Sequence, residues 1–244
     1  MVHEAIILAG GEGTRLRPVT FEIPKPLIPV KGIAIITWQA KWLHTFGITK
    51  ITVIIPPKWQ QVFQEWRDDI VEKISGLEIV LLVEPEPMGT LGACVHLLSV
   101  NGSDPLIVTN GDELKGLDLM QLVATHNRAK EQNPAHAATL GLVEVSNPSD
   151  YGVAELDGSR IVRFHEKPAN PPSRLISAGL YCVEPRAFLV ADQSKRFLMF
   201  EKDLFPQLAE RGELGGCGLA GPWFDCGTLE RWALAIREWP ESAL

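Results

Sequence analysis

The sequence has few cysteines and no excess of positive charge. Its four cysteines form no C-x-x-C pair and no zinc-ligand spacing, which favours reduced thiols; a disulfide between Cys217 and Cys226 is an alternative without support. The formal net charge is −7, whereas nucleic acids and anionic membrane surfaces attract proteins through a broad excess of lysine and arginine. We therefore expect no nucleic-acid partner and no membrane partner.

Long apolar runs and targeting signals are lacking too. No apolar run approaches the roughly 20 residues that span a bilayer, and the N-terminus, MVHEAIILAGG, has no basic stretch typical of a signal peptide. These absences indicate a cytoplasmic protein. The residues that are present, 45% hydrophobic and 22% charged among 244, are typical of a folded globular protein, and we expect one domain over residues 1–244.

The spacing of apolar residues predicts alternating strands and helices in the first half of the chain. The expected strands are Glu4–Ala9, Lys50–Pro56, Leu77–Val83 and Pro105–Thr109, and the expected helices are Ile33–Phe46, Trp59–Ile74, Gly89–Leu98 and Leu117–Ala129. Such alternation is typical of a doubly wound parallel sheet.

The second half is richer in strands. We expect strands at Ala135–Val145, Val153–Leu156, Arg160–Glu166 and Leu175–Val183, an edge strand at Leu214–Ala220, and helices at Phe200–Ala209 and Leu229–Arg237. Asp157 and Gly158 form a hairpin turn between two of these strands, which indicates antiparallel pairing there.

A glycine-rich turn follows the first expected strand. Glycines at positions 10, 11 and 13 let backbone N–H groups approach an anion that a side chain would obstruct. Arg15 and Arg17 follow, and Lys25 stands between two prolines, whose fixed φ angles restrict where the lysine points. A plain tight turn is the alternative for the glycines alone. The nearby cations favour a phosphate site, and the rigidly held lysine indicates a catalytic role.

Two other nucleotide-binding patterns do not fit this turn. Leu16 stands where the dinucleotide pattern has its third glycine, which weakens a dinucleotide-dependent oxidoreductase as an interpretation. No Gly-Lys-Ser/Thr follows the glycines, so the turn is not a P-loop.

Eight short motifs follow one another along the chain. They are LAGGEGTRLRP (Leu8–Pro18), PKPLIPV (Pro24–Val30), PEPMGTLGA (Pro85–Ala93), TNGD (Thr109–Asp112), YGV (Tyr151–Val153), FHEKP (Phe164–Pro168), SAGLY (Ser177–Tyr181) and WFDCGT (Trp223–Thr228). Each is weak alone, but in all eight together the chain resembles the sugar-1-phosphate nucleotidylyltransferases, also called nucleotide-sugar pyrophosphorylases. The resemblance implies an α/β fold, a Rossmann-like three-layer αβα sandwich with a mixed, mostly parallel central sheet.

The resemblance also implies a reaction. An oxygen of a sugar 1-phosphate would attack the α-phosphate of a nucleoside triphosphate, and pyrophosphate would leave. Because several phosphate charges meet, positioning and charge neutralisation should dominate catalysis. On this resemblance Arg15 contacts the departing pyrophosphate and Lys25 the α-phosphate region. The implied nucleotide-binding residues are Leu8, Ala9, Gly10, Gly11, Gly13, Thr14, Glu84, Gly89 and Thr90.

Two aspartates are implied to hold Mg²⁺. Asp112 ends a buried strand and Asp225 precedes a turn into the last helix, so we expect both carboxylates to reach the same cleft. Mg²⁺ commonly takes one or two protein carboxylates together with phosphate oxygens and water. A turn residue and a helix N-terminal anion are the alternatives for isolated aspartates, and the motif context disfavours both.

The implied sugar-phosphate-binding residues are Asn110, Gly152, Glu166, Lys167 and Ser177. Strand alternation would send Glu166 and Lys167 to opposite faces, although the following proline ends the strand and leaves their geometry open; a solvated Glu–Lys pair is the alternative. Many relatives have asparagine where Ser177 stands, and a hydroxyl offers shorter and different hydrogen bonds. This position therefore bears on the choice of sugar.

The substrates are the least specified part of the resemblance. The run PMGTLG within residues 84–92 resembles the guanylyl-transferring branch, which favours GTP with mannose 1-phosphate. A heptose- or N-acetyl-sugar 1-phosphate with GTP or UTP is the alternative. A catalytically silent, nucleotide-sugar-binding regulatory subunit is an alternative of another class, although it would be expected to lose Lys25, Asp112 or Asp225. We expect no C-terminal β-helix domain, and a homo-oligomer stays open.

Overall fold

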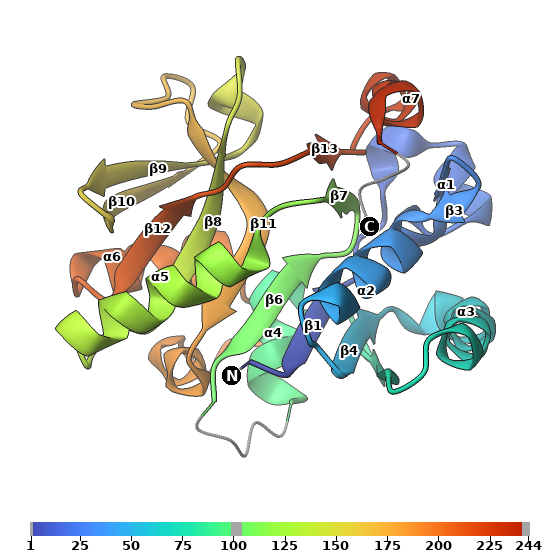
Figure 1. Ribbon diagram of the computed structural model, residues 1–244, viewed down its shortest axis with the longest axis horizontal. Coiled ribbons are helices and arrows are strands. Elements are labelled where there is room, and N and C mark those ends of the chain that lie inside the picture. The colour runs from blue at the N-terminus through green and yellow to red at the C-terminus, as the bar shows by residue number, and fades with distance from the viewer. Residues whose placement is uncertain (1, 99–103, 241–244) are drawn as a thin grey trace. The chain divides into compact units, whose positions relative to one another are not determined.

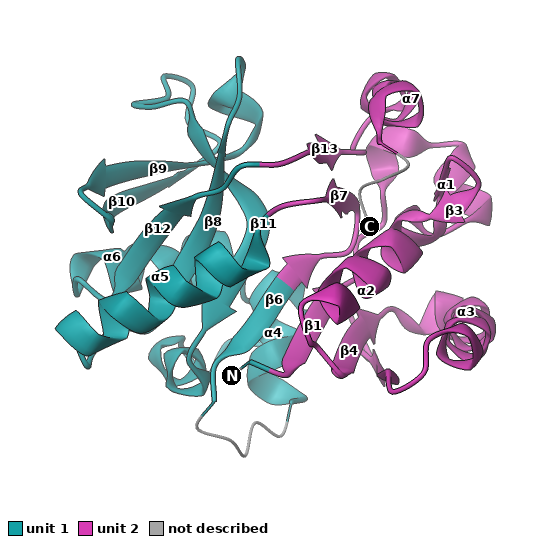
Figure 2. Ribbon diagram, viewed as in Figure 1, with its two compact units in different colours: residues 1–2, 88–108, 118–220 teal, residues 3–87, 109–117, 221–244 magenta. Residues whose placement is uncertain are grey.

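The computed structural model describes residues 2–98 and 104–240. The chain divides into two compact units (Figure 2). Unit 1 consists of residues 1–2, 88–108 and 118–220, and unit 2 consists of residues 3–87, 109–117 and 221–244. Each unit therefore combines segments that are far apart in the sequence.

Unit 2 is built on parallel strands that alternate with helices (Figure 1). The strands lie in the order β5-β4-β1, and the bounds are β1 (Glu4–Leu8), β4 (Lys50–Ile55), β5 (Glu78–Val83), α2 (Ile35–Thr45) and α3 (Gln60–Lys73). The two helices pack together, since Trp66 Nε1 donates a hydrogen bond to Thr37 Oγ1 at 2.8 Å. This alternation is the one that the apolar spacing predicts for the first half of the chain.

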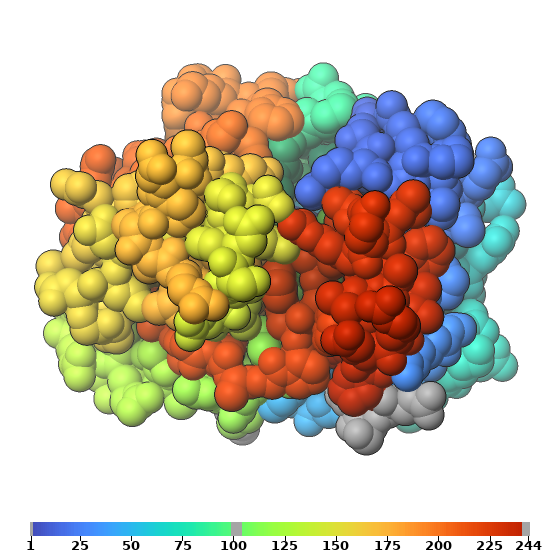
Figure 3. Space-filling model, turned by 90° about the horizontal axis from the view of Figure 1, so that it is seen from above, coloured from blue at the N-terminus to red at the C-terminus, as the bar shows by residue number. Residues whose placement is uncertain are grey.

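Shorter elements complete unit 2. They are α1 (Val19–Glu22), the ladder of β2 (Pro29–Val30) with β3 (Ile33–Ala34), the ladder of β7 (Glu113–Lys115) with β13 (Trp223–Asp225), and α7 (Leu229–Glu238). α7 lies on the face seen in Figure 3, in red. Trp239, which follows α7, packs edge-on against Trp38 with ring centroids 5.9 Å apart, and this contact ties the segment directly after α7 to α2.

Unit 1 contains the more antiparallel part of the fold. Its strands lie in the order β6-β11-β8-β12-β10-β9, with the bounds β6 (Leu106–Asn110, whose last two residues belong to unit 2), β8 (Ala138–Glu144), β9 (Gly152–Asp157), β10 (Arg160–Glu166), β11 (Leu175–Val183) and β12 (Leu214–Gly218). β8 and β12 are parallel, whereas the β8–β11, β9–β10 and β10–β12 pairs are antiparallel. The expected mixed sheet is confirmed, but a predominance of parallel pairs is not.

The helices of unit 1 are α4 (Gly89–His96), α5 (Leu119–Gln132) and α6 (Phe205–Glu210). α5 covers one face of the strands and α6 the other (Figure 1). On the α6 side, Phe205 packs against Tyr181 and Phe164, with ring centroids 4.9 and 5.2 Å apart. Before α6, residues Phe200–Leu204 form one turn of π-helix, a rare geometry that is frequent at functional sites.

One strand lies elsewhere than the sequence indicates. The edge strand expected at Leu214–Ala220 corresponds to β12, which lies inside the sheet, between β8 and β10. Glycine is required there because a Cβ atom on Gly216 would come 2.8 Å from the Leu142 side chain, and one on Gly215 2.9 Å from the His136 ring. The glycines make room for neighbouring side chains rather than marking an edge.

The structure bears on two expectations from composition. The four cysteines all lie within the described residues, are buried and form no disulfide, as expected. Over residues 2–98 and 104–240, no helix combines the length and the apolar character that crossing a membrane requires.

Candidate functional site

The loop that follows β1, residues 9–14, is called the glycine loop below. Gly13 has a left-handed φ of 62°, and a Cβ atom there would come 2.8 Å from Thr20 Cγ2, so glycine is required. The Thr20 hydroxyl donates a hydrogen bond to Gly13 O at 2.9 Å and closes the loop. A Cβ atom on Gly11, by contrast, would meet no described atom within 4 Å. The backbone at Gly11 is therefore open to a ligand.

Gly10 and Glu84, both predicted to bind nucleotide, lie together in unit 2. A Cβ atom on Gly10 would meet the carboxylate of Glu84, which is buried and directly follows β5. The Glu84 N–H donates to Ile55 O at 2.9 Å. Both residues thus stand at the carboxyl ends of parallel strands, where ligands bind in open α/β sheets.

Lys25 is held rigidly, as its flanking prolines predict. It begins a one-turn 3₁₀ helix (Lys25–Leu27), and its side chain is buried. Lys25 Nζ donates to Asp112 Oδ2 at 2.5 Å and lies 3.9 Å from Asp225 Oδ1. Burial alone would lower the pKa of Lys25, but the two carboxylates outweigh burial and raise the pKa. In turn, Lys25 overcomes burial and lowers the pKa of Asp112, so the pair is fully charged.

The ladder of β7 and β13 brings the two predicted metal ligands together. Glu113 pairs in register with Asp225, so Asp112, the residue before β7, lies next to Asp225. The Gly111 N–H donates to Leu8 O at 2.8 Å and fixes the preceding turn beside β1. Sequence spacing missed this ladder because strands of three residues are too short to show periodicity.

A buried polar network supports the ladder. Glu113 Oε2 forms an ion pair with Lys115 Nζ at 3.0 Å and accepts a hydrogen bond from Trp223 Nε1 at 3.0 Å. Glu113 Oε1 accepts a hydrogen bond from Asn110 Nδ2, also at 3.0 Å. From α2, Gln39 Nε2 donates to the carbonyl oxygens of Asn110 and Glu113 at 2.8 and 2.7 Å. Only Asn110 among these residues was predicted, as a sugar or ribose contact, and its amide is engaged in this network.

Two arginines lie beside Asp225. Arg231, in the first turn of α7, has Nη1 2.7 Å from Asp225 Oδ2. A Cβ atom on Gly227 would come 2.7 Å from Asp225 Oδ1 and 3.0 Å from Arg15 Nη2. Glycine at position 227 therefore lets the predicted pyrophosphate ligand, Arg15, lie beside Asp225. Arg231 was missed because helical spacing makes it an ordinary solvent-facing residue.

The two aspartates fit Mg²⁺ by the chemistry of their donors. Within the described residues, no three His, Cys, Asp or Glu side chains converge as a metal-ligand group. A Mg²⁺ ion needs no more than one or two protein carboxylates when phosphates complete its shell. The position between Asp112 and Asp225 already attracts the Lys25 ammonium group, so it favours positive charge.

In unit 1, Glu166 and Lys167 meet on one side despite their neighbouring positions. β10 ends at Glu166, and Lys167 has a left-handed φ of 46°, which is uncommon for a residue with a side chain. Lys167 Nζ lies 3.5 Å from Glu166 Oε1. The turn in the backbone thus overrides the alternation that would separate the two side chains in an ideal strand.

Two further predicted sugar contacts lie in the strands of unit 1. Gly152 pairs with Glu166 in the β9–β10 ladder, and a Cβ atom there would meet the ring of Phe164 and come 3.3 Å from Glu166 Oε2. Ser177 Oγ accepts a hydrogen bond from the Gly179 N–H at 3.3 Å, where the register of β11 shifts. The Ser177 hydroxyl therefore has a partner within its own strand.

α4 begins with Gly89 and Thr90, both predicted to bind nucleotide. Gly89 has a φ of 76°, and a Cβ atom there would meet the carbonyl oxygen of Leu198. Thr90 Oγ1 accepts a hydrogen bond from the Phe200 N–H at 3.0 Å and donates one to Glu201 Oε2 at 2.9 Å. Glu201 was not predicted from the sequence, because it lies 111 positions from Thr90.

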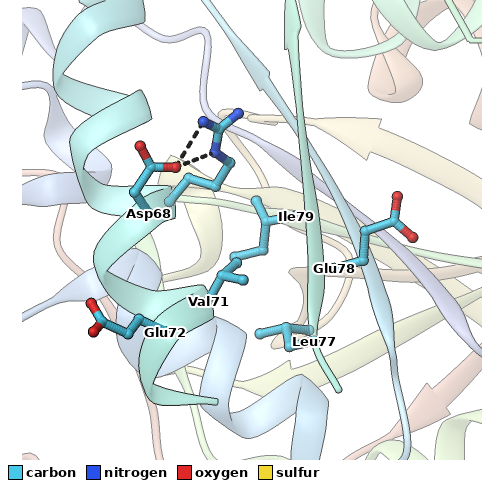
Figure 4. A pocket seen from close by; sticks show the side chains of 7 residues that line it. Asp68, Val71, Glu72, Leu77, Glu78 and Ile79 are labelled. Atoms are coloured by element: carbon cyan, nitrogen blue, oxygen red, sulfur yellow. Dashed lines mark hydrogen bonds and ion pairs between the residues drawn. The ribbon is translucent and has the colours of Figure 1, made fainter. Parts of the chain in front are cut away.

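A separate cavity of about 630 Å³ lies between α3 and β5 (Figure 4). It is lined by Arg67, Asp68, Val71, Glu72, Leu77, Glu78 and Ile79. None of the residues predicted for catalysis or binding lines it, and Arg67 turns back to form hydrogen bonds with Asp68.

Comparisons with known proteins agree with the motifs. Residues 4–240 match the family model described as nucleotidyl transferase. The chain is 34% identical to a mannose-1-phosphate guanylyltransferase of Mycobacterium tuberculosis, over 93% of this chain and 62% of that protein. It is also 34% identical to mannose-1-phosphate guanyltransferase beta-B of Xenopus laevis, over 92% of this chain and 61% of that protein. The chain thus spans about three fifths of the length of these relatives.

Solved structures share the fold. One assigned to a glucose-1-phosphate thymidylyltransferase of Bacillus anthracis has a TM-score of 0.82 at 26% identity, over 96% of this chain and 94% of that one. A UDP-glucose pyrophosphorylase, at 20% identity and a TM-score of 0.78, covers 98% of both chains and has the same fold. The match to the family model over residues 4–240 shows that the chain belongs to the nucleotidyl transferase family.

Proposed function

We propose that this protein transfers a nucleotidyl group from a nucleoside triphosphate to a sugar 1-phosphate, giving an NDP-sugar and pyrophosphate. The observation that carries the proposal is the group of Lys25, Asp112 and Asp225, beside a glycine loop whose Gly13 would bring a Cβ atom 3.3 Å from Lys25 Cβ. The names of the relatives support GTP and mannose 1-phosphate as substrates.

In this proposal unit 2 handles the triphosphate. Backbone N–H groups of the glycine loop bind phosphate oxygens, and Lys25 donates hydrogen bonds to the α-phosphate as charge builds up there. A sugar-phosphate oxygen forms a new bond to the α-phosphorus, and the bond to the bridging oxygen breaks. Pyrophosphate leaves with that electron pair, and Arg15 neutralises it. Asp112 and Asp225 would hold a Mg²⁺ ion, which would supply further charge neutralisation.

Unit 1 handles the sugar phosphate. Glu166 accepts hydrogen bonds from sugar hydroxyls, and Lys167, 3.5 Å from it, binds the phosphate. Gly152 keeps the space beside Glu166 clear of a Cβ atom. Ser177 remains the residue that we expect to influence the choice of sugar.

We also propose that residues 1–244 form a single nucleotidyltransferase domain of the Rossmann-like three-layer type. The likeness to two solved structures over nearly the whole chain supports this. A cytoplasmic location stays a prediction, and a homo-oligomeric state stays open.

Pyrophosphate release tests the proposal. The protein would be mixed with Mg²⁺, each of the common nucleoside triphosphates and a panel of sugar 1-phosphates that includes mannose, heptose and N-acetyl-sugar derivatives. Release with GTP and mannose 1-phosphate is expected. Release with another pair would correct the substrates but keep the reaction, and no release with any pair would favour a silent binding subunit and overturn the proposal.

A further inference from the structure

We propose that Glu201 is a second sugar-binding carboxylate in unit 1, and that Thr90 is a positioning residue that acts through it. In this inference, which rests on the proposed function, Glu201 accepts a hydrogen bond from a hydroxyl group of the bound sugar 1-phosphate. Thr90 holds the carboxylate in place.

The hydrogen bonds at Thr90 orient the carboxylate of Glu201 and leave it capacity to accept more hydrogen bonds. Because Thr90 Oγ1 accepts from the Phe200 N–H, its own proton points to Glu201 Oε2. An ionised carboxylate has roughly four acceptor sites, and the Thr90 hydroxyl and the backbone N–H of Glu201 itself occupy only part of them. Glu201 is half-buried rather than fully buried, so part of the residue is exposed to a ligand.

The π-helical turn that carries Glu201 lies beside β10, the strand that ends at Glu166, because Phe205, directly after the turn, packs against Phe164 with ring centroids 5.2 Å apart. The charges of Glu166 and Lys167 both act on the Glu201 carboxyl: burial raises the pKa of Glu201, Glu166 raises it further, and Lys167 opposes the rise. The carboxylates of Glu166 and Glu201 repel each other, and hydrogen-bond donors placed between them would stabilise both. Ionised carboxylates are acceptors only, so neither can supply such a donor to the other. A sugar provides several hydroxyl donors close together, and Lys167 provides the cation that a phosphate requires.

The backbone around Glu201 is rigid, which suits a binding residue. Glu201 lies in the π-helical turn Phe200–Leu204, and Phe200 is fully buried against Tyr181 and Phe205, with ring centroids 5.5 and 5.6 Å away. The Met199 N–H donates to Asp203 Oδ2 at 2.8 Å and closes the turn. A carboxylate fixed before the ligand arrives loses little conformational freedom on binding.

The alternative is that Glu201 only fastens the start of α4 through Thr90. The two roles differ in their consequences. A fastening role predicts a loss of stability in Glu201 variants without any preference for a particular sugar hydroxyl. A binding role predicts weaker binding of the sugar phosphate, unchanged binding of the nucleotide, and dependence on one hydroxyl of the sugar.

Calorimetric titration with mannose 1-phosphate and, separately, with GTP tests the inference. Glu201→Gln keeps an oxygen for the Thr90 hydroxyl but removes the charge, and Glu210→Gln, at an exposed position on α6, is the matched control. We expect Glu201→Gln to weaken binding of mannose 1-phosphate about tenfold or more, as loss of one charge-assisted hydrogen bond does, with GTP binding unchanged. The mannose 1-phosphate derivative that lacks the hydroxyl bound by Glu201 should bind wild type weakly. Glu201→Gln should bind this derivative no more weakly than wild type does, because the hydrogen bond is already lost.

The Thr90 variants separate positioning from direct contact. Thr90→Val removes the hydroxyl and should weaken sugar-phosphate binding as Glu201→Gln does, whereas Thr90→Ser keeps the hydroxyl and should restore it. This pair carries the same test if Glu201→Gln does not fold.

The outcomes for the two proposals are distinct. Tight binding of mannose 1-phosphate by Glu201→Gln or Thr90→Val overturns the inference, and pyrophosphate release by wild type in that case leaves the proposed function standing. Wild type that binds sugar 1-phosphates through Glu201 but releases no pyrophosphate with any pair overturns the proposed function alone. Wild type that neither binds a sugar 1-phosphate of the panel nor releases pyrophosphate overturns both.

Discussion

Replacement of Lys25 by methionine removes an ammonium group that holds two carboxylates together. At an effective dielectric constant of about 20, attraction over 2.5 Å to Asp112 and over 3.9 Å to Asp225 amounts to roughly 7 and 4 kcal/mol before desolvation. Desolvation offsets most of this, and breaking a buried pair costs about 3–5 kcal/mol. The Asp112 side chain is 36% exposed, so we expect the lower end, a loss of about 3 kcal/mol in the free energy of unfolding.

Mg²⁺ should restore much of that loss. Without the ammonium group, Asp112 and Asp225 repel each other, and a divalent cation between them removes the repulsion. Urea unfolding of wild type and Lys25→Met, each with EDTA and with MgCl₂, measures the effect. We expect Mg²⁺ to stabilise the variant more than wild type.

Lys115→Met is the matched control for this experiment. Lys115 is also buried and also pairs with a carboxylate of β7, with Nζ 3.0 Å from Glu113 Oε2. The Lys115→Met variant should lose a similar amount of its free energy of unfolding. Mg²⁺ should not restore this loss, since Glu113 is not a proposed metal ligand. A loss below about 1 kcal/mol in Lys25→Met, or equal gains from Mg²⁺ in all three proteins, would refute the reasoning.

Three other changes probe the site and the fold. Asp112→Asn should lower kcat about a hundredfold or more with an unchanged circular dichroism spectrum, and wild-type turnover would exclude a metal role. Gly89→Ala should lower the free energy of unfolding by more than Gly76→Ala, because both changes strain a positive φ but only the Cβ atom added at position 89 also meets the Leu198 carbonyl. The strain alone costs about 1–2 kcal/mol, and equal losses in the two variants would exclude the clash. Burial lowers the pKa of His136 to about 4, so below the ordinary pKa of about 6.5 the folded state binds fewer protons than the unfolded state. The contribution of His136 to the free energy of unfolding should therefore fall by about 2 kcal/mol between pH 7 and pH 5. A His136→Asn variant whose stability has the same pH dependence as wild type would contradict this.

The sequence predicts the parts of this fold that rest on long periodic segments. The helices α2 and α3 and the strands β1, β4 and β5 lie where apolar spacing indicates. The helices bury one continuous face, whereas β1 and β4 are compact apolar runs buried on both faces. The flanking prolines of Lys25 predict a lysine whose orientation is restricted. The glycine loop was recognisable from its glycines, and Gly13 does adopt the left-handed φ that requires one.

The parts that sequence spacing missed depend on contacts between distant segments. The β7–β13 ladder joins residues about a hundred positions apart, so neither strand carries a signal of its own. The partnership of Thr90 with Glu201 has the same character. Lys167 turns its side chain toward Glu166 through a positive φ that no residue pattern predicts. The place of β12 inside the sheet depends on its neighbours β8 and β10, which its own residues do not specify.

The turnover of Lys25→Met tests most directly whether Lys25 acts on the reacting phosphate. It would be measured with the substrate pair that wild type uses, at saturating concentrations and with enough Mg²⁺ to keep the variant folded. We predict that kcat falls about a hundredfold to a thousandfold, as it does when a preorganised donor to transition-state charge is removed. A folded Lys25→Met protein that releases pyrophosphate as fast as wild type would contradict this role of Lys25.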